Sequence, residues 1–325
     1  MIAVTGGAGF IGSTIIWELN RRGITDIHVV DELGTDEKWK NLNGLKFSDY
    51  EEKESFIKRV VYDDKLLRDS LEGVIHMGAC SATTEKDASF LIENNYKYTQ
   101  VTGKWCAKYG KKFVYASSAA TYGDGAQGFD DAHEKIESLR PLNMYGYSKQ
   151  LMDLWALRSG IISKMAGIKF FNVFGPNEYH KDDMRSVVHK AFCQINATGK
   201  IQLFKSHKKG YEDGGQLRDF IYVKDAVAMT LHAYDKGLSG IFNAGTGKAR
   251  SFADLAKATF NAMGKPVNIE YIDMPESIRE KYQYFTEAKT DKIRAAGFNG
   301  KIHTLEEGVK DYVQNYLMKD NPFLG

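Results

Sequence analysis

A tyrosine and a lysine four residues apart are the side chains whose spacing most clearly suggests chemistry. Tyr145 and Lys149 belong to the run Tyr-Gly-Tyr-Ser-Lys, and on a helix this spacing places them on one face. An ammonium group lowers the pKa of a nearby phenol, ordinarily about 10, because it favours the phenolate. Ser118 ends a β-rich run and can bond the same oxygen. The tyrosine is therefore predicted to take a proton from an alcohol, although such pairs also occur as ordinary helix decoration.

The N-terminal residues predict a binding site for a dinucleotide that could take part in this chemistry. Residues 2–5 read as a buried strand and run into a Gly-Gly-Ala-Gly-Phe-Ile-Gly turn and an apolar-periodic helix. Gly6 permits the tight turn, Gly9 lets the backbone approach a pyrophosphate, and Gly12 permits close helix packing. A second strand ends at Asp31, about twenty residues further on, where a carboxylate can bond an adenosine ribose. Strand, turn, helix and acid together predict dinucleotide binding.

The order of elements predicts the fold class. Strand-like runs alternate with helical segments, which is typical of an α/β protein with a Rossmann-type, doubly wound parallel sheet. Shorter, mixed elements follow about Gly175, so we expect a dinucleotide-binding domain over 1–175 and a mainly substrate-binding lobe over 176–325, with a strand near 240–243 returning to the main sheet. Expected strands are 2–5, 27–31, 73–78, 112–117, 168–173, 201–204 and 217–222; expected helices are 10–22, 51–60, 89–109, 145–164, 183–198, 224–236, 252–263 and 304–318.

Composition narrows the function classes. The 325 residues are 43% apolar and 26% charged, which is ordinary for a globular protein with a large core. A net charge of +2 and the short basic cluster within 205–209 do not indicate a nucleic-acid partner. Three cysteines without C-x-x-C spacing specify neither a disulfide framework nor a metal site. With no visible signal peptide or apolar run of about eighteen residues, a cytoplasmic protein without a membrane partner is expected.

These motifs resemble the extended short-chain dehydrogenase/reductase family, and within it the ADP-heptose 6-epimerases. The similar stretches are 1–30, 79–81, 115–123, 141–143, 171–176, 218–220 and 295–297. The resemblance implies inversion of C6 of an ADP-activated manno-heptose through transient oxidation by a bound cofactor, for the inner core of lipopolysaccharide. It also implies a homo-oligomer, and by the family's pattern a pentamer.

A second proton donor separates an epimerase from a dehydrogenase, because the intermediate ketone must be reduced on its opposite face. The resemblance places this donor at Lys181, although a loop lysine is more often simply solvated. A sugar-nucleotide dehydratase carries an Asp-Glu pair where this chain has Ala119 and Ala120, so elimination would lack its acid and base. The alternatives are a UDP-hexose 4-epimerase, which does not require Lys181, and a non-catalytic dinucleotide sensor, which the retained Ser, Tyr and Lys disfavour.

Arg218 resembles the family's clamp on the substrate diphosphate. A guanidinium matches phosphate geometry bidentately, and the alternative is a local pair with Asp219. The family pattern implies these substrate-binding residues: Ser118, Asn172, His180, His189, Phe204, Lys205, Ser206, His207, Arg218 and Tyr282.

The form of the nicotinamide nucleotide rests on four side chains. Asp31 and Glu32 favour NAD, because carboxylates repel a 2′-phosphate. The resemblance implies NADP, with Lys38 and Lys53 offsetting the phosphate charge, so NADP is expected and NAD is the alternative. Departures from the family pattern are Asn177 for an arginine, Glu32 for an asparagine, and an apparent insertion at 211–215. The implied cofactor contacts are Gly6, Gly9, Phe10, Ile11, Gly12, Asp31, Glu32, Lys38, Lys53, Met77, Gly78, Ala79, Cys80, Ser81, Asn94, Tyr145, Lys149, Val173 and Lys181.

Overall fold

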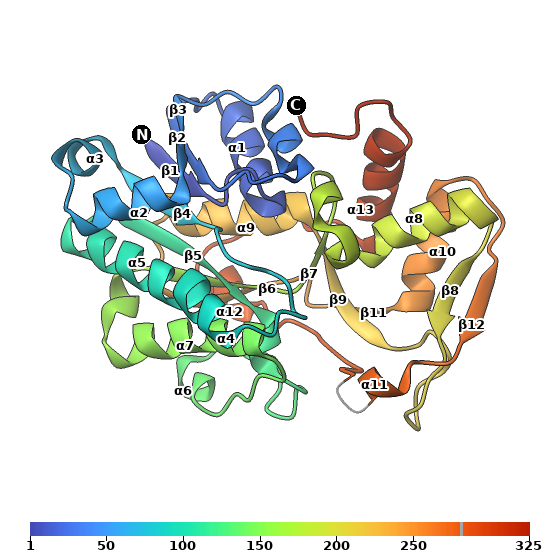
Figure 1. Cartoon of the computed structure of the whole chain (residues 1–325). Coiled ribbons are helices and arrows are strands. Elements are labelled where there is room, and N and C mark those ends of the chain that lie inside the picture. Colours follow the sequence, from blue (N-terminus) through green and yellow to red (C-terminus); the bar gives the residue numbers. More distant parts are fainter. Residues whose placement is uncertain (280–281) are drawn as a thin grey trace.

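A parallel β-sheet forms the centre of the protein (Figure 1). The computed structural model describes residues 1–279 and 282–325, and within them seven strands follow the order β10-β6-β5-β4-β1-β2-β3. Inner strands such as β1 and β4 are buried along their whole length, as expected when helices cover both faces of a parallel sheet. The strands are β1 Ile2–Thr5, β2 Ile27–Asp31, β3 Asp49–Glu52, β4 Gly73–His76, β5 Lys112–Ser118, β6 Ala166–Phe170 and β10 Gly240–Ala244. The α/β fold class is confirmed.

Helices cover the sheet on both sides because successive strand residues point to opposite faces. Val4 of β1 belongs to an apolar cluster with α1 and α9, whereas Ala3 belongs to a second cluster with α2, α5 and α7. Figure 1 shows α2, α5 and α7 in front of the sheet and α9 behind it. The helices are α1 Phe10–Arg21, α2 Lys53–Val61, α5 Tyr98–Lys108, α7 Met144–Arg158 and α9 Val223–Asp235.

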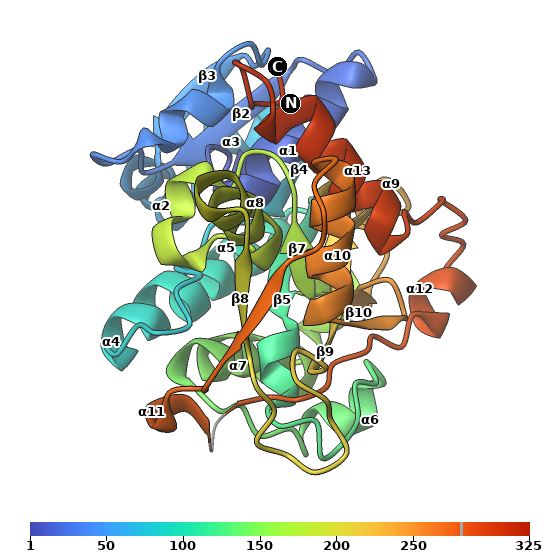
Figure 2. The ribbon, with the colours of Figure 1, turned by 90° about the vertical axis from the view of Figure 1, so that its right-hand side faces the viewer.

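The remaining elements form a smaller lobe beside the sheet. β7 (Asn172–Phe174), β9 (Leu217–Tyr222) and β11 (Ala249–Ser251) form one small sheet. β8 (Ile201–Phe204) and β12 (Ile269–Ile272) form another and lie side by side in Figure 2. The larger helices of this lobe are α8 Val187–Thr198, α10 Phe252–Ala262 and α13 Leu305–Tyr312. None of the helices in the described ranges is both long and apolar enough to span a bilayer.

Short helical segments complete the chain. The α-helical ones are α3 Lys65–Ser70, α4 Ala88–Leu91, α6 His133–Ile136, α11 Glu276–Arg279 and α12 Asp291–Ala295. The 3₁₀ segments are η1 Glu37–Leu42, η3 Ala119–Tyr122, η4 Ile161–Lys164 and η5 Tyr179–Met184, and the π-helical ones are η2 Ile92–Lys97 and η6 Val313–Leu317. The predicted single helices over 89–109, 145–164 and 304–318 are therefore each divided.

The predicted strand over 168–173 is wrong as a single element. β6 ends at Phe170, the amide of Phe171 donates to the carbonyl of Ala244 (3.1 Å), and β7 begins at Asn172 beside β9. The single residue Phe171 therefore separates the last strand residue in the main sheet from the first strand residue in the smaller lobe. The predicted helix over 51–60 is also wrong at its start, because residues 49–52 pair with β2 as an edge strand and the helix begins at Lys53. The strands β11 and β12 were not predicted.

Candidate functional site

A cleft of about 1200 Å³ lies where the strands of the main sheet end. Thr5 of β1, Asp31 of β2, His76 of β4, Ser118 of β5 and Phe170 of β6 all line it. The carboxyl ends of parallel strands share one edge, which is where open α/β sheets bind their ligands. Arg218 and Tyr282 from the smaller lobe line the same cleft, so the two parts of the chain enclose it together.

The glycine turn after β1 has the geometry of a phosphate cradle. Gly6 has a φ of +65°, and a Cβ there would lie 2.6 Å from the amide nitrogen of Gly78. A Cβ on Gly12 would lie 2.0 Å from the carbonyl oxygen of Gly6, so neither position accepts a side chain. Gly9 caps α1, and among the described residues no side chain bonds the helix N-terminus there. The first amides of α1 therefore face the cleft and fit a pyrophosphate.

The acid at the end of β2 is held by its neighbours. Asp31 accepts hydrogen bonds from the amides of Ala8 (2.8 Å) and Glu32 (2.7 Å) and from Nζ of Lys38 (2.9 Å). Lys53 pairs with Glu32 at 2.5 Å, and this bond lowers the pKa of the Glu32 carboxyl. Two lysines and two carboxylates thus meet at the point where an adenosine ribose fits.

Tyr145 lies in the first turn of α7. Oδ1 of Asn143 caps the helix by accepting from the amide of Gly146 (2.7 Å). Tyr145 is half-buried in the wall of the cleft, where burial raises the pKa of its phenol and the nearby hydroxyl of Ser118 lowers it. The pKa was predicted to fall through Lys149. Instead Nζ of Lys149 donates to the carbonyl of Ala116 (2.8 Å), and burial lowers the pKa of Lys149 to about 8.

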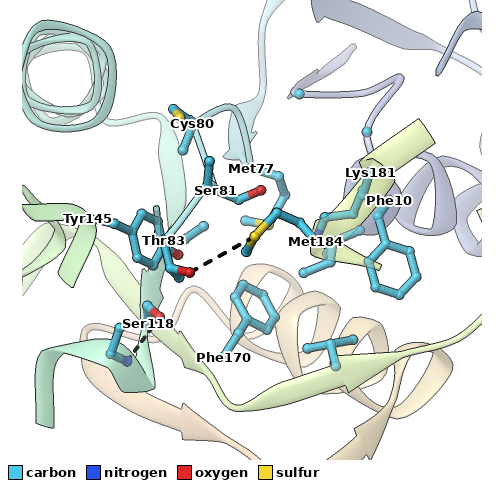
Figure 3. A pocket seen from close by; sticks show the side chains of 18 of the residues that line it. Phe10, Met77, Cys80, Ser81, Thr83, Ser118, Tyr145, Phe170, Lys181 and Met184 are labelled. Atoms are coloured by element: carbon cyan, nitrogen blue, oxygen red, sulfur yellow. Dashed lines mark hydrogen bonds between the residues drawn. The ribbon is translucent and has the colours of Figure 1, made fainter. Parts of the chain in front are cut away.

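Lys181 approaches the cleft from the other side. Its amide donates to the carbonyl of Glu178 (3.1 Å), and its Nζ lies 5.5 Å from the centre of the Phe10 ring. Burial lowers the pKa of Lys181, while the carboxylate of Glu178 raises it. Figure 3 shows Lys181 and Tyr145 on opposite sides of the pocket, with Met184 between them. A group able to exchange a proton therefore stands on each side.

Arg218 is buried where the smaller lobe lines the cleft. Its guanidinium carbon lies 5.4 Å from the ring centre of Tyr282 and 5.6 Å from that of Phe252, and Nη1 donates to the carbonyl of Leu217 (2.9 Å). Asp219 points to the opposite face of β9, as alternation along a strand requires. Its carboxylate accepts from the amides of Thr246 (2.7 Å), Gly247 (2.9 Å) and Ala288 (3.0 Å). The alternative of a local Arg218–Asp219 pair is thus not what the structure contains.

Comparison with known proteins agrees with this geometry. The model of the NAD dependent epimerase/dehydratase family matches residues 2–245. The chain belongs to that family. Membership identifies the cofactor as a nicotinamide dinucleotide, and the glycine turn and Asp31 are the parts of the chain that fit it.

Relatives of known name match along the whole length of the chain. It is 54% identical over 325 residues to an ADP-L-glycero-D-manno-heptose-6-epimerase of Nitratidesulfovibrio vulgaris, and 49% identical over 334 residues to the protein of that name in Fusobacterium nucleatum, with all of each chain covered. Among solved structures it resembles the ADP-L-glycero-D-manno-heptose-6-epimerase of Helicobacter pylori, with a TM-score of 0.80, 26% identity, and coverage of 97% of this chain and 95% of the other.

Most of the residues predicted from the sequence to bind cofactor or substrate line the cleft. Five substrate-binding candidates do not line the cleft that the described residues define. The ring of His189 packs on Tyr179, 5.7 Å between centres, and Phe204 packs against Tyr282. Their neighbours are held within the smaller lobe: Lys205 pairs with Asp273 (3.4 Å), the amide of Ser206 donates to Asp213 (2.8 Å), and the amide of His207 donates to the hydroxyl of Tyr284 (2.9 Å). The candidates that do line it are Gly6, Gly9, Phe10, Ile11, Gly12, Asp31, Glu32, Lys38, Lys53, Met77, Gly78, Ala79, Cys80, Ser81, Asn94, Ser118, Tyr145, Lys149, Asn172, Val173, His180, Lys181, Arg218 and Tyr282.

Other residues that line the cleft were not predicted from the sequence. Met184 and Arg185 line it, and their place soon after Lys181 in the same loop was a usable signal. His76 was given no role, yet it ends β4 beneath the cleft between the hydroxyls of Thr5 (2.6 Å) and Thr99 (2.9 Å). Burial lowers the pKa of His76 to about 3, so the ring is neutral and forms part of the cleft wall.

Proposed function

We propose that this protein is an isomerase, an ADP-heptose 6-epimerase that converts ADP-D-glycero-D-manno-heptose to ADP-L-glycero-D-manno-heptose for the lipopolysaccharide inner core. The observation that carries the proposal is the pair of proton-exchanging side chains, Tyr145 and Lys181, on opposite sides of one cleft (Figure 3). Full-length relatives with this name at 54% and 49% identity support it. A dehydrogenase needs one such group, whereas inversion of a carbinol carbon benefits from two.

Each residue has a defined part in the proposed reaction. When bound, the nicotinamide dinucleotide supplies the acceptor and the donor of hydride. Tyr145 removes the proton of the C6 hydroxyl, with Ser118 bonding the same oxygen, and the substrate becomes a 6-ketone. After the ketone has turned to present its other face, Lys181 protonates the oxygen. Exchange with solvent then returns both groups to their starting states.

Turnover of a C6-deuterated substrate tests the function. We expect ADP-D-glycero-D-manno-heptose to be converted to its L epimer with the deuterium retained, because no external redox partner takes part. The product is identified by NMR of the C6 centre. Conversion of UDP-glucose to UDP-galactose without turnover of the ADP-heptose would establish the 4-epimerase alternative instead, and binding without turnover of either would establish the sensor.

We propose NADP as the resident nucleotide, supported by Lys38 and Lys53 at the ribose end of the cleft. Protein purified and then denatured is expected to release NADP. Lys38→Met should weaken NADP binding by roughly ten- to 150-fold, the loss expected for one charged hydrogen bond, and NAD binding by less. Lys40→Met is the matched control, because Lys40 lies on the same 3₁₀ segment, pairs with Glu37 (2.7 Å) where Lys38 pairs with Asp31, and does not line the cleft. Release of NAD alone would overturn the proposal.

Arg218→Ala is expected to weaken binding of ADP-heptose and of free ADP alike, by roughly ten- to 150-fold, because a guanidinium addresses the diphosphate and not the sugar. KM should rise with little change in kcat, the pattern of uniform binding loss. Arg250→Ala provides the control, because Arg250 is the cross-strand neighbour of Arg218 but pairs with Glu306 (2.6 Å). Unchanged ADP affinity with a collapse of kcat would place Arg218 among the reacting groups.

We also propose that the enzyme works as a cytoplasmic homo-oligomer, with a pentamer as the family pattern implies. Light scattering of the purified protein measures the number of subunits directly.

A further inference from the structure

Helix α7 carries a third ionisable residue, Asp153, on the same face as Tyr145 and Lys149. Asp153 follows Lys149 by four residues, and its side chain is completely buried. Its carboxylate accepts hydrogen bonds from the hydroxyls of Tyr115 (2.9 Å) and Ser117 (2.8 Å) and from Nζ of Lys169 (2.7 Å). One carboxylate therefore joins α7 to both β5 and β6.

Lys169 extends this connection to the serine of the site. Its side chain is also completely buried, and its Nζ makes a second hydrogen bond to Oγ1 of Thr121 (2.6 Å). The Thr121 hydroxyl in turn donates to the carbonyl of Ser118 (2.8 Å). A continuous chain of bonds thus runs from α7 through β6 to the backbone of Ser118.

A buried ion pair of this kind is not explained by stability. Removing two charges from water costs several kcal/mol each, and apolar side chains of similar volume commonly serve a core as well or better. What the pair provides is a fixed register, because each charge has one charged partner and further oriented hydroxyl partners: Tyr115 and Ser117 donate to the carboxylate, and Thr121 accepts from the ammonium. The elements that it fixes are those that carry Ser118, Tyr145 and Lys149.

The negative charge of Asp153 also interacts electrostatically with Lys149. Burial lowers the pKa of Lys149 to about 8, and the carboxylate of Asp153 is the first opposing influence. The other groups that face Lys149 are the carbonyl of Ala116 on β5, the thiol of Cys80 after β4, and the neutral ring of His76 on β4. On its own helix Lys149 shares a face with Tyr145.

We propose that Asp153 and Lys169 form a positioning pair for the catalytic centre, in which the pair locks α7 against the ends of β5 and β6 and the carboxylate of Asp153, one helical turn from Lys149, faces the Lys149 ammonium as its counter-charge. The inference rests on the proposed function only in calling Lys149 catalytic. Neither residue of the pair touches the cleft, so both act through Lys149 and Ser118.

Two substitutions separate the charge effect from simple loss of structure. Asp153→Asn and Lys169→Met both break the same ion pair, but only the first removes the negative charge that faces Lys149. In the purified holoenzyme with ¹³C-labelled lysine, NMR follows the titration of Lys149, whose signal Lys149→Arg identifies. Asp153→Asn should move the midpoint to lower pH by about one unit or more, and the alkaline limb of kcat/KM should move with it. Lys169→Met should not lower the midpoint, because the hydroxyls of Tyr115 and Ser117 continue to stabilise the carboxylate.

Equal midpoints in the two variants would overturn the proposal and leave the pair with a structural role only. If either single variant does not fold, Asp153→Asn with Lys169→Gln removes both charges and leaves no lone buried ion. The midpoint of Lys149 in this double variant is again expected below that of the wild type, and a wild-type midpoint would overturn the proposal. Since no sugar nucleotide is present, the NMR titration reports on the pair whether or not ADP-heptose is the substrate.

Discussion

Tyr145→Phe is expected to reduce epimerisation of ADP-heptose by about 10²–10⁴-fold, the usual contribution of a positioned general acid or base. The hydroxyl that this change removes lies in the cleft near Ser118, and phenylalanine supplies no acid or base in its place. The ring itself remains, so the walls of the cleft and the affinity for the sugar nucleotide should change little. Steady-state kcat and calorimetric binding of the ADP-heptose measure the two effects separately.

Tyr147→Phe is the matched control for this experiment. Tyr147 lies two residues further along α7 and is 53% exposed, so loss of its hydroxyl should leave kcat at the wild-type value. Turnover of Tyr145→Phe within a few-fold of wild type would show that the phenol is not the base. A parallel loss of substrate affinity would instead assign the hydroxyl to ground-state binding.

Local sequence patterns were enough to predict that the glycine turn, Asp31 and Ser118 lie at one cleft. The turn between β1 and α1 is contiguous in sequence, and Gly6 and Gly12 are required there by contacts within the turn and with Gly78. Asp31 and Ser118 end strands, and parallel strands bring their ends together whatever the details of packing. The opposite directions of Arg218 and Asp219 likewise follow from the alternation of a strand.

Properties that depend on tertiary packing could not be predicted in this way. The pKa of Tyr145 rises because tertiary packing buries the side chain. The carbonyl of Ala116 that accepts the hydrogen bond of Lys149 lies 33 residues away in sequence. The edge strand β3 contains acidic residues that ordinarily disfavour strands, and it forms because β2 offers a free edge. Asp153 was visible as the residue four after Lys149, but its partner Lys169 was not, because no periodicity relates α7 to β6.

Lys181→Met is expected to reduce epimerisation as severely as Tyr145→Phe, by about 10²–10⁴-fold, while ADP-heptose still binds. The side chain of methionine retains most of the length of lysine against Phe10 but cannot donate a proton. Burial lowers the pKa of Lys181, so its ammonium gives up a proton more readily than that of a solvated lysine. Lys190→Met is the control, since Lys190 is exposed on α8 and bonds only the carbonyl of Asp183 (2.7 Å) among described residues.

The two catalytic variants should also differ from each other in a way that neither misfolding nor weak binding can imitate. If Tyr145 serves one epimer and Lys181 the other, each variant retains transient oxidation of the epimer that its remaining group serves. Stopped-flow absorbance of the reduced nucleotide, recorded with the D and then the L epimer, should therefore show opposite preferences in Tyr145→Phe and Lys181→Met. Loss of both signals in Tyr145→Phe, together with both retained in Lys181→Met, would mean that the tyrosine serves both faces, and the role proposed for Lys181 would be wrong.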